Sequence, residues 1–150
     1  MPAITAIYNE IIATPEITAL LNTYAYTTGS TPIPAVFTSA VIPQDLTGPY
    51  AILSVPTSSS GGNSEDRGHI AGLSMVDIVV YDEKARSSKS LRATAQLIWE
   101  TIHRATMEVT GYEVWVLATP PAQLSDPDGF PGYVVSCKAT IRELDKGVGS

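Results

Sequence analysis

Between Ile70 and Thr106 the spacing of the apolar residues changes from a period of two to a helical period. Residues Leu73 to Tyr81 alternate, which places successive side chains on opposite faces of a strand. One face would carry Leu73, Met75, Asp77, Val79 and Tyr81, and the other Ser74, Val76, Ile78 and Val80. After a polar turn at 82–88, a helical stripe follows: Leu91, Ala95, Ile98, Ile102 and Ala105. A long strand that leads into a long amphipathic helix predicts an open sheet with a helix packed across one face.

Further strands complete this sheet. Tyr112 to Ala118 and Tyr133 to Arg142 alternate in the same way, Tyr50 to Val55 is bounded by prolines, and Ala35 to Ala40 is a weaker candidate. The last strand has an apolar face and a mostly polar one, as in an antiparallel sheet with one wet side. Its apolar face consists of Tyr133, Val135, Cys137, Ala139 and Ile141. We therefore expect an α+β fold with a mostly antiparallel sheet of about four to five strands and the long helix on one face.

The N-terminal segment, Ile4 to Leu21, predicts two short helices or one broken helix. A second helix would start at Thr14-Pro15-Glu16, with Thr14 as the N-cap, Pro15 at the first helical position and Glu16 in the first turn. The segment Tyr26 to Pro34 is rich in Thr, Gly, Ser and Pro and is expected to be a loop.

A chain of 150 residues has the length of one ordinary domain, and we expect a single domain over 1–150. Two long polar loops, at about 56–69 and 120–131, should interrupt it, and the tail 146–150 should fray. Loops of this length are usually functional or disordered. The first loop is thus either a flexible hairpin arm or an arm that becomes ordered on a partner.

The composition narrows the possible partners. The single cysteine, Cys137, excludes an internal disulfide, and its place on an apolar strand face indicates a buried structural thiol. Nine basic residues against fifteen acidic ones give a net charge of −6, which argues against binding the phosphate backbone of nucleic acid. No segment predicts a membrane span or a signal peptide, so we expect a soluble protein made in a cytoplasm.

No pattern of reactive side chains indicates an enzyme. His69 and His103 lack the HExxH or paired-cysteine context of a zinc site, so we interpret His103 as an ordinary helix-surface residue. The segment Asp126 to Gly129 lacks the further ligands of a calcium loop and is better explained as a proline-set turn. Gly61-Gly62 is not followed by Gly-Lys-Ser/Thr, and no serine lies in Gly-x-Ser-x-Gly. We expect no catalytic residue, no cofactor and no bound metal.

The two tryptophans are first expected to serve packing. Trp99 lies one residue off the helical stripe and should flank the buried face. Trp115 shares its strand face with Glu113 and Leu117, which favours a half-buried position. If Trp115 is exposed instead, it becomes the leading candidate for a subunit-interface anchor, because Trp is enriched at such positions.

The order of these elements is similar to that of a known family. N-terminal helices precede the proline-led strand Pro49–Leu53, a polar loop, the strand Met75–Tyr81, a Ser-rich turn and the helix Leu91–Ile98. Over about Ile4 to Glu143 the chain in this way resembles the tail-terminator, or tail-completion, proteins of long-tailed bacteriophages. In that family a strand ending in Tyr, a short polar turn and a helix with an Ala/Leu stripe recur in this order. The two long loops depart from a minimal member.

The resemblance implies a structural virion protein rather than an enzyme. Such subunits form a homo-oligomeric ring, six-membered in the family, at the head-proximal end of the tail tube. The ring stops tube growth and presents a surface to the head connector. The implied partners are further copies of the chain, the tail tube protein and the head–tail connector or neck protein. DNA would pass through the ring without specific binding, which suits an excess of acidic residues. Assembly would occur in the host cytoplasm, and the final location would be the virion.

This family has no side-chain signature that transfers position by position, so candidate interface residues come from surface reasoning. In the first loop we expect intersubunit charge contacts from Asp66 and Arg67, with His69 at the end of the loop. In the second loop Phe130 either packs onto the core or anchors a partner. Trp115 completes the set.

Two other interpretations stay open. A head-completion or neck adaptor protein would differ only in its position in the particle. A small-ligand-binding α+β domain would need a concave pocket with convergent polar groups. A ring subunit needs instead exposed complementary surfaces and available strand edges.

Overall fold

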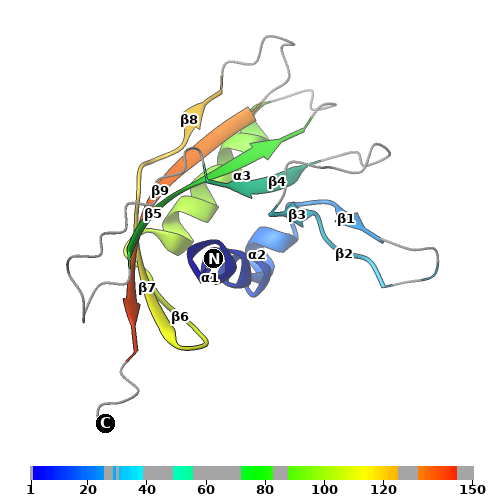
Figure 1. Cartoon of the computed structure of the whole chain (residues 1–150). Coiled ribbons are helices and arrows are strands. Elements are labelled where there is room, and N and C mark those ends of the chain that lie inside the picture. Colours follow the sequence, from blue (N-terminus) through cyan, green and yellow to red (C-terminus); the bar gives the residue numbers. More distant parts are fainter. Residues whose placement is uncertain are drawn as a thin grey trace.

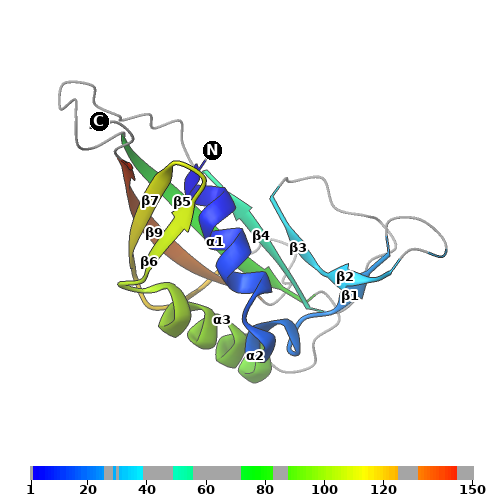
Figure 2. The same cartoon turned by 90° about the horizontal axis from the view of Figure 1, so that it is seen from below.

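The computed structural model describes residues 2–25, 29, 31–38, 49–55, 72–82, 88–124 and 132–144. Within these ranges the helices are α1 (Pro2–Ile12), α2 (Pro15–Thr18) and α3 (Ser88–Ile102). The strands are β1 (Thr23–Tyr24), β2 (Ile33–Pro34), β3 (Val36–Phe37), β4 (Tyr50–Ser54), β5 (Gly72–Tyr81), β6 (Thr106–Val109), β7 (Tyr112–Ala118), β8 (Ala122–Gln123) and β9 (Gly132–Glu143). They form an α+β fold in which a curled sheet wraps around α1 and α3 (Figures 1 and 2).

Seven strands form one mixed sheet. Its order is β3-β4-β5-β9-β7-β6, and β8 pairs with the part of β9 that β7 leaves free. β3 runs parallel to β4, and the other pairs in this sheet are antiparallel. The expectation of a mostly antiparallel sheet of four to five strands was wrong, because the sheet is larger and mixed. The unpredicted strands β6 and β8 have only four and two residues, too few for alternation to be recognised.

The centre of the sheet is the pair of long strands β5 and β9, which face each other from Gly72↔Ile141 to Tyr81↔Gly132. Both strands were predicted, and the assignment of residues to their two faces is confirmed by burial. The covered face of these strands includes Val76, Ile78, Val80, Val135, Cys137 and Ala139, all buried. Register is strongly specified there, because a slip by one residue would expose this whole set.

Both long helices pack on the same face of the sheet (Figure 2). The predicted stripe of α3 is buried, and α1 adds a second buried row beside it. The buried helical residues include Leu91, Ala95, Ile98 and Ile102 on α3, and Ala3, Ile7 and Ile11 on α1. As a consequence, no described helix lies on the opposite face of the sheet (Figures 1 and 2).

The expected break between two N-terminal helices is confirmed. α1 ends at Ile12 and α2 begins at Pro15, with Thr14 in an extended conformation (φ −104°, ψ 100°). The Thr14 hydroxyl does not cap α2 but donates to the Glu10 carbonyl at 2.8 Å, which ties the new helix to the end of the old one. α2 then contributes the buried side chain of Ile17 to the core.

Two aromatic side chains, Trp99 on α3 and His103 directly after its end, connect this helix to the end of β7. The Trp99 and His103 rings stack with their centroids 5.1 Å apart. Trp99 Nε1 donates to the Ala118 carbonyl at 3.0 Å, and the Ala118 amide donates to His103 Nδ1 at 3.0 Å. Trp99 thus flanks the buried face as predicted. The interpretation of His103 as an ordinary surface residue was wrong, because its ring satisfies the backbone amide of a buried residue.

β1 and β2 form a separate two-stranded arm beside the β3 end of the large sheet (Figure 1). The range 26–34 was predicted to be a loop, and β2 at its end shows that this was partly wrong. The arm has only two cross-strand residue pairs. Its base is fixed by backbone hydrogen bonds of 2.9 Å, from the Asn22 amide to the Pro49 carbonyl and from the Ala35 amide to the Asn22 carbonyl.

Candidate assembly surface

The face of the sheet opposite α1 and α3 has no described helix on it, and we call it the open face. Alternation along each strand decides which side chains reach it. In a sheet that is covered on one side, the other side should be polar. β9 follows this rule with Ser136, Lys138 and Thr140, as the sequence predicted. Its two neighbours, β5 and β7, do not follow it.

Four large apolar side chains on β5 and β7 point to the open face and are between 36% and 42% exposed. They are Leu73, Met75, Trp115 and Leu117, and we call them the open-face patch. Single exposed apolar residues are normal on protein surfaces, whereas grouped ones mark interaction sites. Four of the seven large hydrophobic side chains exposed among the described residues belong to this one patch, so the exposure is concentrated.

The strand register brings these four residues together around β9. Leu73 and Trp115 are both cross-strand partners of Thr140, and Met75 and Leu117 are both partners of Lys138. Neighbouring strands are about 4.8 Å apart and alternate residues about 7 Å apart, so the four Cβ atoms mark a rectangle of roughly 10 by 7 Å. The apolar side chains therefore border one surface with Lys138 between them.

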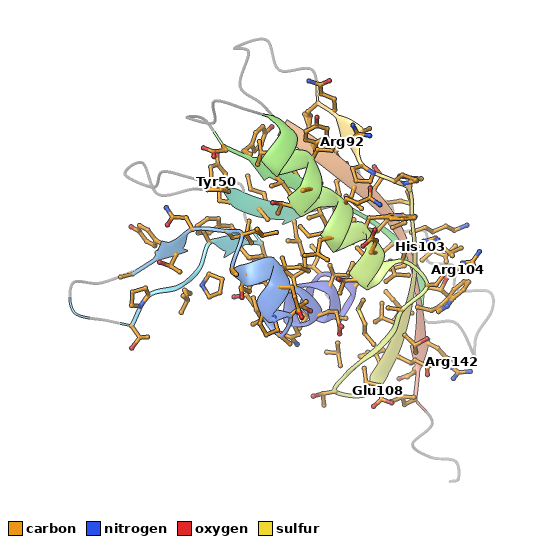
Figure 3. The ribbon with its side chains drawn as sticks, turned by 180° about the vertical axis from the view of Figure 1, so that it is seen from behind. Tyr50, Arg92, His103, Arg104, Glu108 and Arg142 are labelled. Atoms are coloured by element: carbon orange, nitrogen blue, oxygen red, sulfur yellow. The ribbon has the colours of Figure 1, made fainter. Side chains whose placement is uncertain are left out.

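Lys138 is the cation within this patch. It is exposed and forms no ion pair with the residues that the structure describes. The ion pair on this face joins Arg142 to Glu113, which lie opposite each other on β9 and β7. Glu113 in turn faces Glu108 on β6, and Figure 3 shows Glu108 and Arg142 at this end of the sheet. The patch is thus apolar with a positive charge, which suits a partner that presents apolar side chains and a carboxylate.

At the β3–β4 end of the open face, aromatic side chains pack against one another. Tyr50, labelled in Figure 3, meets Phe37 edge-on with ring centroids 6.3 Å apart. The same ring lies 5.9 Å from that of Tyr81, its cross-strand partner. This small cluster also contacts Tyr24 of the arm. Among the described residues, the large apolar side chains exposed on this face therefore lie in its β5–β9–β7 part.

Trp115 is exposed, which is the condition under which it becomes the leading interface candidate. Its role in an interface stays a prediction. The three other members of the open-face patch were not singled out from the sequence. A signal for them existed, because each occupies an outward position on a strand whose inward face was already identified, and a large apolar residue is unexpected there.

The other candidate interface residues, Asp66, Arg67, His69 and Phe130, lie outside the residues that the structure describes. The same holds for most of both long loops, 56–69 and 120–131, and for the tail 146–150. The open-face patch is therefore formed by strand residues alone.

The single cysteine offers no reactive thiol to this surface. Cys137 lies on the covered face and is fully buried, as predicted. Burial, together with the nearby Asp77 carboxylate, raises the pKa of its thiol to about 12. The reactive thiolate is thus scarcely populated at neutral pH.

Two further observations concern the part of the chain that the structure describes. It contains no group of three His, Cys, Asp or Glu side chains arranged to hold a metal ion. Within the same ranges, no helix has both the length and the apolar character needed to cross a membrane.

Comparison with known proteins gives one informative result. No family model matches the chain, and no curated protein sequence matches it. Among solved structures, a chain of the "Virion of native gene transfer agent (GTA) particle" has a similar fold, with a TM-score of 0.68 and 17% sequence identity. The match covers 92% of this chain and 92% of that chain. At this identity the similarity establishes a shared fold across nearly the whole chain.

Proposed function

We propose that this chain is a structural protein of a phage-like virion, and that it assembles with copies of itself into a ring that caps the head-proximal end of a tail tube. The observation that carries the proposal is the open-face patch, a group of large apolar side chains exposed on the uncovered side of a sheet. The ring would end tube polymerisation on one side and present a surface to the head connector on the other.

Similarity in fold supports the proposal, since a chain of a gene transfer agent virion has the same fold over 92% of its length. A fold by itself hosts many functions, so the site has to carry the functional argument. The order of elements resembles that of tail-terminator proteins. This resemblance supports two finer parts of the proposal, the position at the head-proximal end of the tail tube and the six-membered ring.

The physics of the patch supports self-assembly. Exposed apolar area is favourable to bury, at about 25 cal/mol per Å². Trp115 has the size and the position of an anchor residue, because Trp dominates the binding energy of many interfaces. Lys138 inside the patch adds selectivity, since a partner without a matching acid would leave that charge poorly solvated.

The acidic balance of the chain suits a ring through which DNA moves. With a net charge of −6, a ring of several copies would repel phosphates rather than retain them.

Negative-stain electron microscopy tests the proposal, first on the purified chain at high concentration and then on the chain mixed with tail tubes. Six-fold annular particles, or tube ends that carry a ring and no longer grow, are the expected results. Tubes that stay uncapped and continue to elongate in the presence of the chain would contradict the capping role. Rings that bind isolated connectors but not tubes would indicate a neck adaptor instead.

A further inference from the structure

A second group of exposed apolar side chains lies in the N-terminal part of the chain. Ile12 at the end of α1, Leu20 after α2 and Ile33 on β2 are between 37% and 43% exposed. Together with the open-face patch they account for all seven large hydrophobic side chains that are exposed among the described residues. The exposed apolar surface thus falls into two groups that come from different parts of the chain.

Charge distinguishes the two groups. No Lys or Arg occurs before Arg67, and no charged residue of either sign occurs from Ile17 to Gln44. Residues 1–44 carry two charged side chains, Glu10 and Glu16, and Glu16, in the first turn of α2, is the exposed one. We group Ile12, Glu16, Leu20 and Ile33 by their place in the chain and call them the N-terminal surface. It combines apolar side chains with a carboxylate, whereas the open-face patch surrounds the ammonium group of Lys138.

The arm, which carries Ile33, and β7, which carries Trp115 and Leu117, belong to different ends of the molecule. The sheet order places β3, next to the arm, at one end and β7 and β6 at the other. Figures 1 and 2 both show the β1–β2 arm on the side away from β7. A head-to-tail contact needs two different complementary surfaces on one subunit, and such contacts close into rings when the rotation permits.

The arm itself has a physical reason to be covered. A two-stranded ribbon is marginally stable in water when it stands alone. This arm has two cross-strand residue pairs and leaves Ile33 exposed, so packing against a neighbour would stabilise it. Depletion of charge is also typical of the buried centre of an interface.

We propose that the N-terminal surface of one copy packs on the open-face patch of a second copy, and that Glu16 pairs with Lys138 across this contact. The inference rests on the proposed function, because it names the two surfaces through which the ring would form. The apolar side chains supply the affinity. The ion pair sets the register, because docking in another alignment would bury Lys138 without a partner.

Disulfide cross-linking tests the contact and does not require a closed ring. Leu20→Cys and Leu117→Cys are prepared as separate full-length variants, mixed at equal concentration and oxidised. The native Cys137 is buried and does not compete. We expect mixed dimers in large excess over the dimers formed by either variant alone. Ala93→Cys, at an exposed position on α3, serves as the control for random collisions.

Two outcomes of the cross-linking would overturn the proposed contact. The first is a yield of mixed dimers no higher than that obtained by mixing Ala93→Cys with either variant. The second is a predominance of Leu20→Cys homodimers, which would replace the head-to-tail contact with a symmetric one.

A charge swap tests the ion pair. Glu16→Lys or Lys138→Glu alone should weaken self-association by about tenfold or more, because each places like charges opposite one another. The double variant restores opposite charges at every contact and should recover most of the wild-type association in sedimentation velocity experiments. A double variant that associates no better than the single variants would show that these two residues do not meet.

The cross-linking result and the microscopy are independent. Six-fold rings without Leu20–Leu117 cross-links would overturn this contact and leave the ring in place. Mixed cross-links in a chain that never caps a tube would support the contact and remove the capping role.

Discussion

The two faces of β5 and β7 are both rich in apolar side chains, yet the fold treats them differently. On the covered face, Val76, Ile78 and Val116 are completely buried beneath α1 and α3. On the open face, Leu73 and Trp115 keep 42% of their surface exposed. An isolated subunit gains little from a large apolar side chain in water. The comparison therefore separates residues that hold the fold from residues that are available to a partner.

The most direct test of this difference between the two faces is to shorten one side chain on each face of the same strand. Ile78→Ala should lower the free energy of unfolding by about 2–5 kcal/mol, because it leaves a cavity in a packed core. Leu73→Ala, its counterpart on the open face, should cost less than about 1 kcal/mol. Urea denaturation of both variants measures the difference. Equal losses would mean that the open face contributes to the fold of the single subunit.

Trp115→Ala should weaken assembly more than folding, which is the reverse of what we expect for Ile78→Ala. We expect self-association to weaken by about 2 kcal/mol or more, the cost of losing an anchor tryptophan. The stability of the single subunit should change by less than about 1 kcal/mol. Sedimentation velocity and thermal unfolding on the same samples check both parts. Thr106→Ala, at the exposed cross-strand neighbour of Trp115, is the control and should leave association nearly unchanged.

The covered side also depends on the link between α3 and the end of β7. His103→Phe keeps a ring against Trp99 but removes the acceptor for the Ala118 amide, so we expect a loss of about 1–3 kcal/mol. His103→Asn places an oxygen near the position of Nδ1 and should recover part of that loss. If the two variants are equally stable, the hydrogen bond to Ala118 contributes little.

The buried thiol gives the covered face a signature in the pH dependence of stability. The raised pKa of Cys137 means that the folded chain keeps a proton which the unfolded chain releases above about pH 9. Below about pH 9 the thiol is protonated in both states, and it does not reduce the free energy of unfolding. That free energy then falls as the pH rises toward 12, by about 1 kcal/mol at pH 10. Denaturation from pH 7 to 10 should show this decline in the wild type and a smaller decline in Cys137→Ala. Parallel pH profiles for the two proteins would contradict the assignment.

The smallest expected effect concerns a polar residue on the covered face of β5. Ser74 is buried, and its hydroxyl has no hydrogen-bond partner among the described residues. Ser74→Ala should therefore raise the free energy of unfolding by up to about 1 kcal/mol. Ser136→Ala, on the open face of β9, should change it by less than about 0.5 kcal/mol. Destabilisation by Ser74→Ala would indicate that the hydroxyl has a partner in the folded protein.

Part of the candidate surface could be found from the sequence, and part could not. Alternation identified which residues of β5, β7 and β9 share a face, and it made Trp115 a conditional candidate. It could not give the strand order, because β5 and β7 are separated along the chain by α3 and β6 and meet only through β9. Without that order, nothing in the sequence places Leu73 beside Trp115, or Lys138 between Met75 and Leu117.

The sequence by itself determined the long elements and their faces, because a periodic pattern over ten or more residues outweighs local ambiguity. It also determined the break at Thr14, because Pro15 at the first position of α2 acts within one turn. The tertiary structure alone decided the short strands β1, β2, β6 and β8 and the parallel pairing of β3, since pairing partners rather than propensity hold such strands. It also decided which face α1 and α3 cover, and so which apolar side chains stay exposed. Burial depends on contacts between distant segments, and one side chain in isolation gives no information about them.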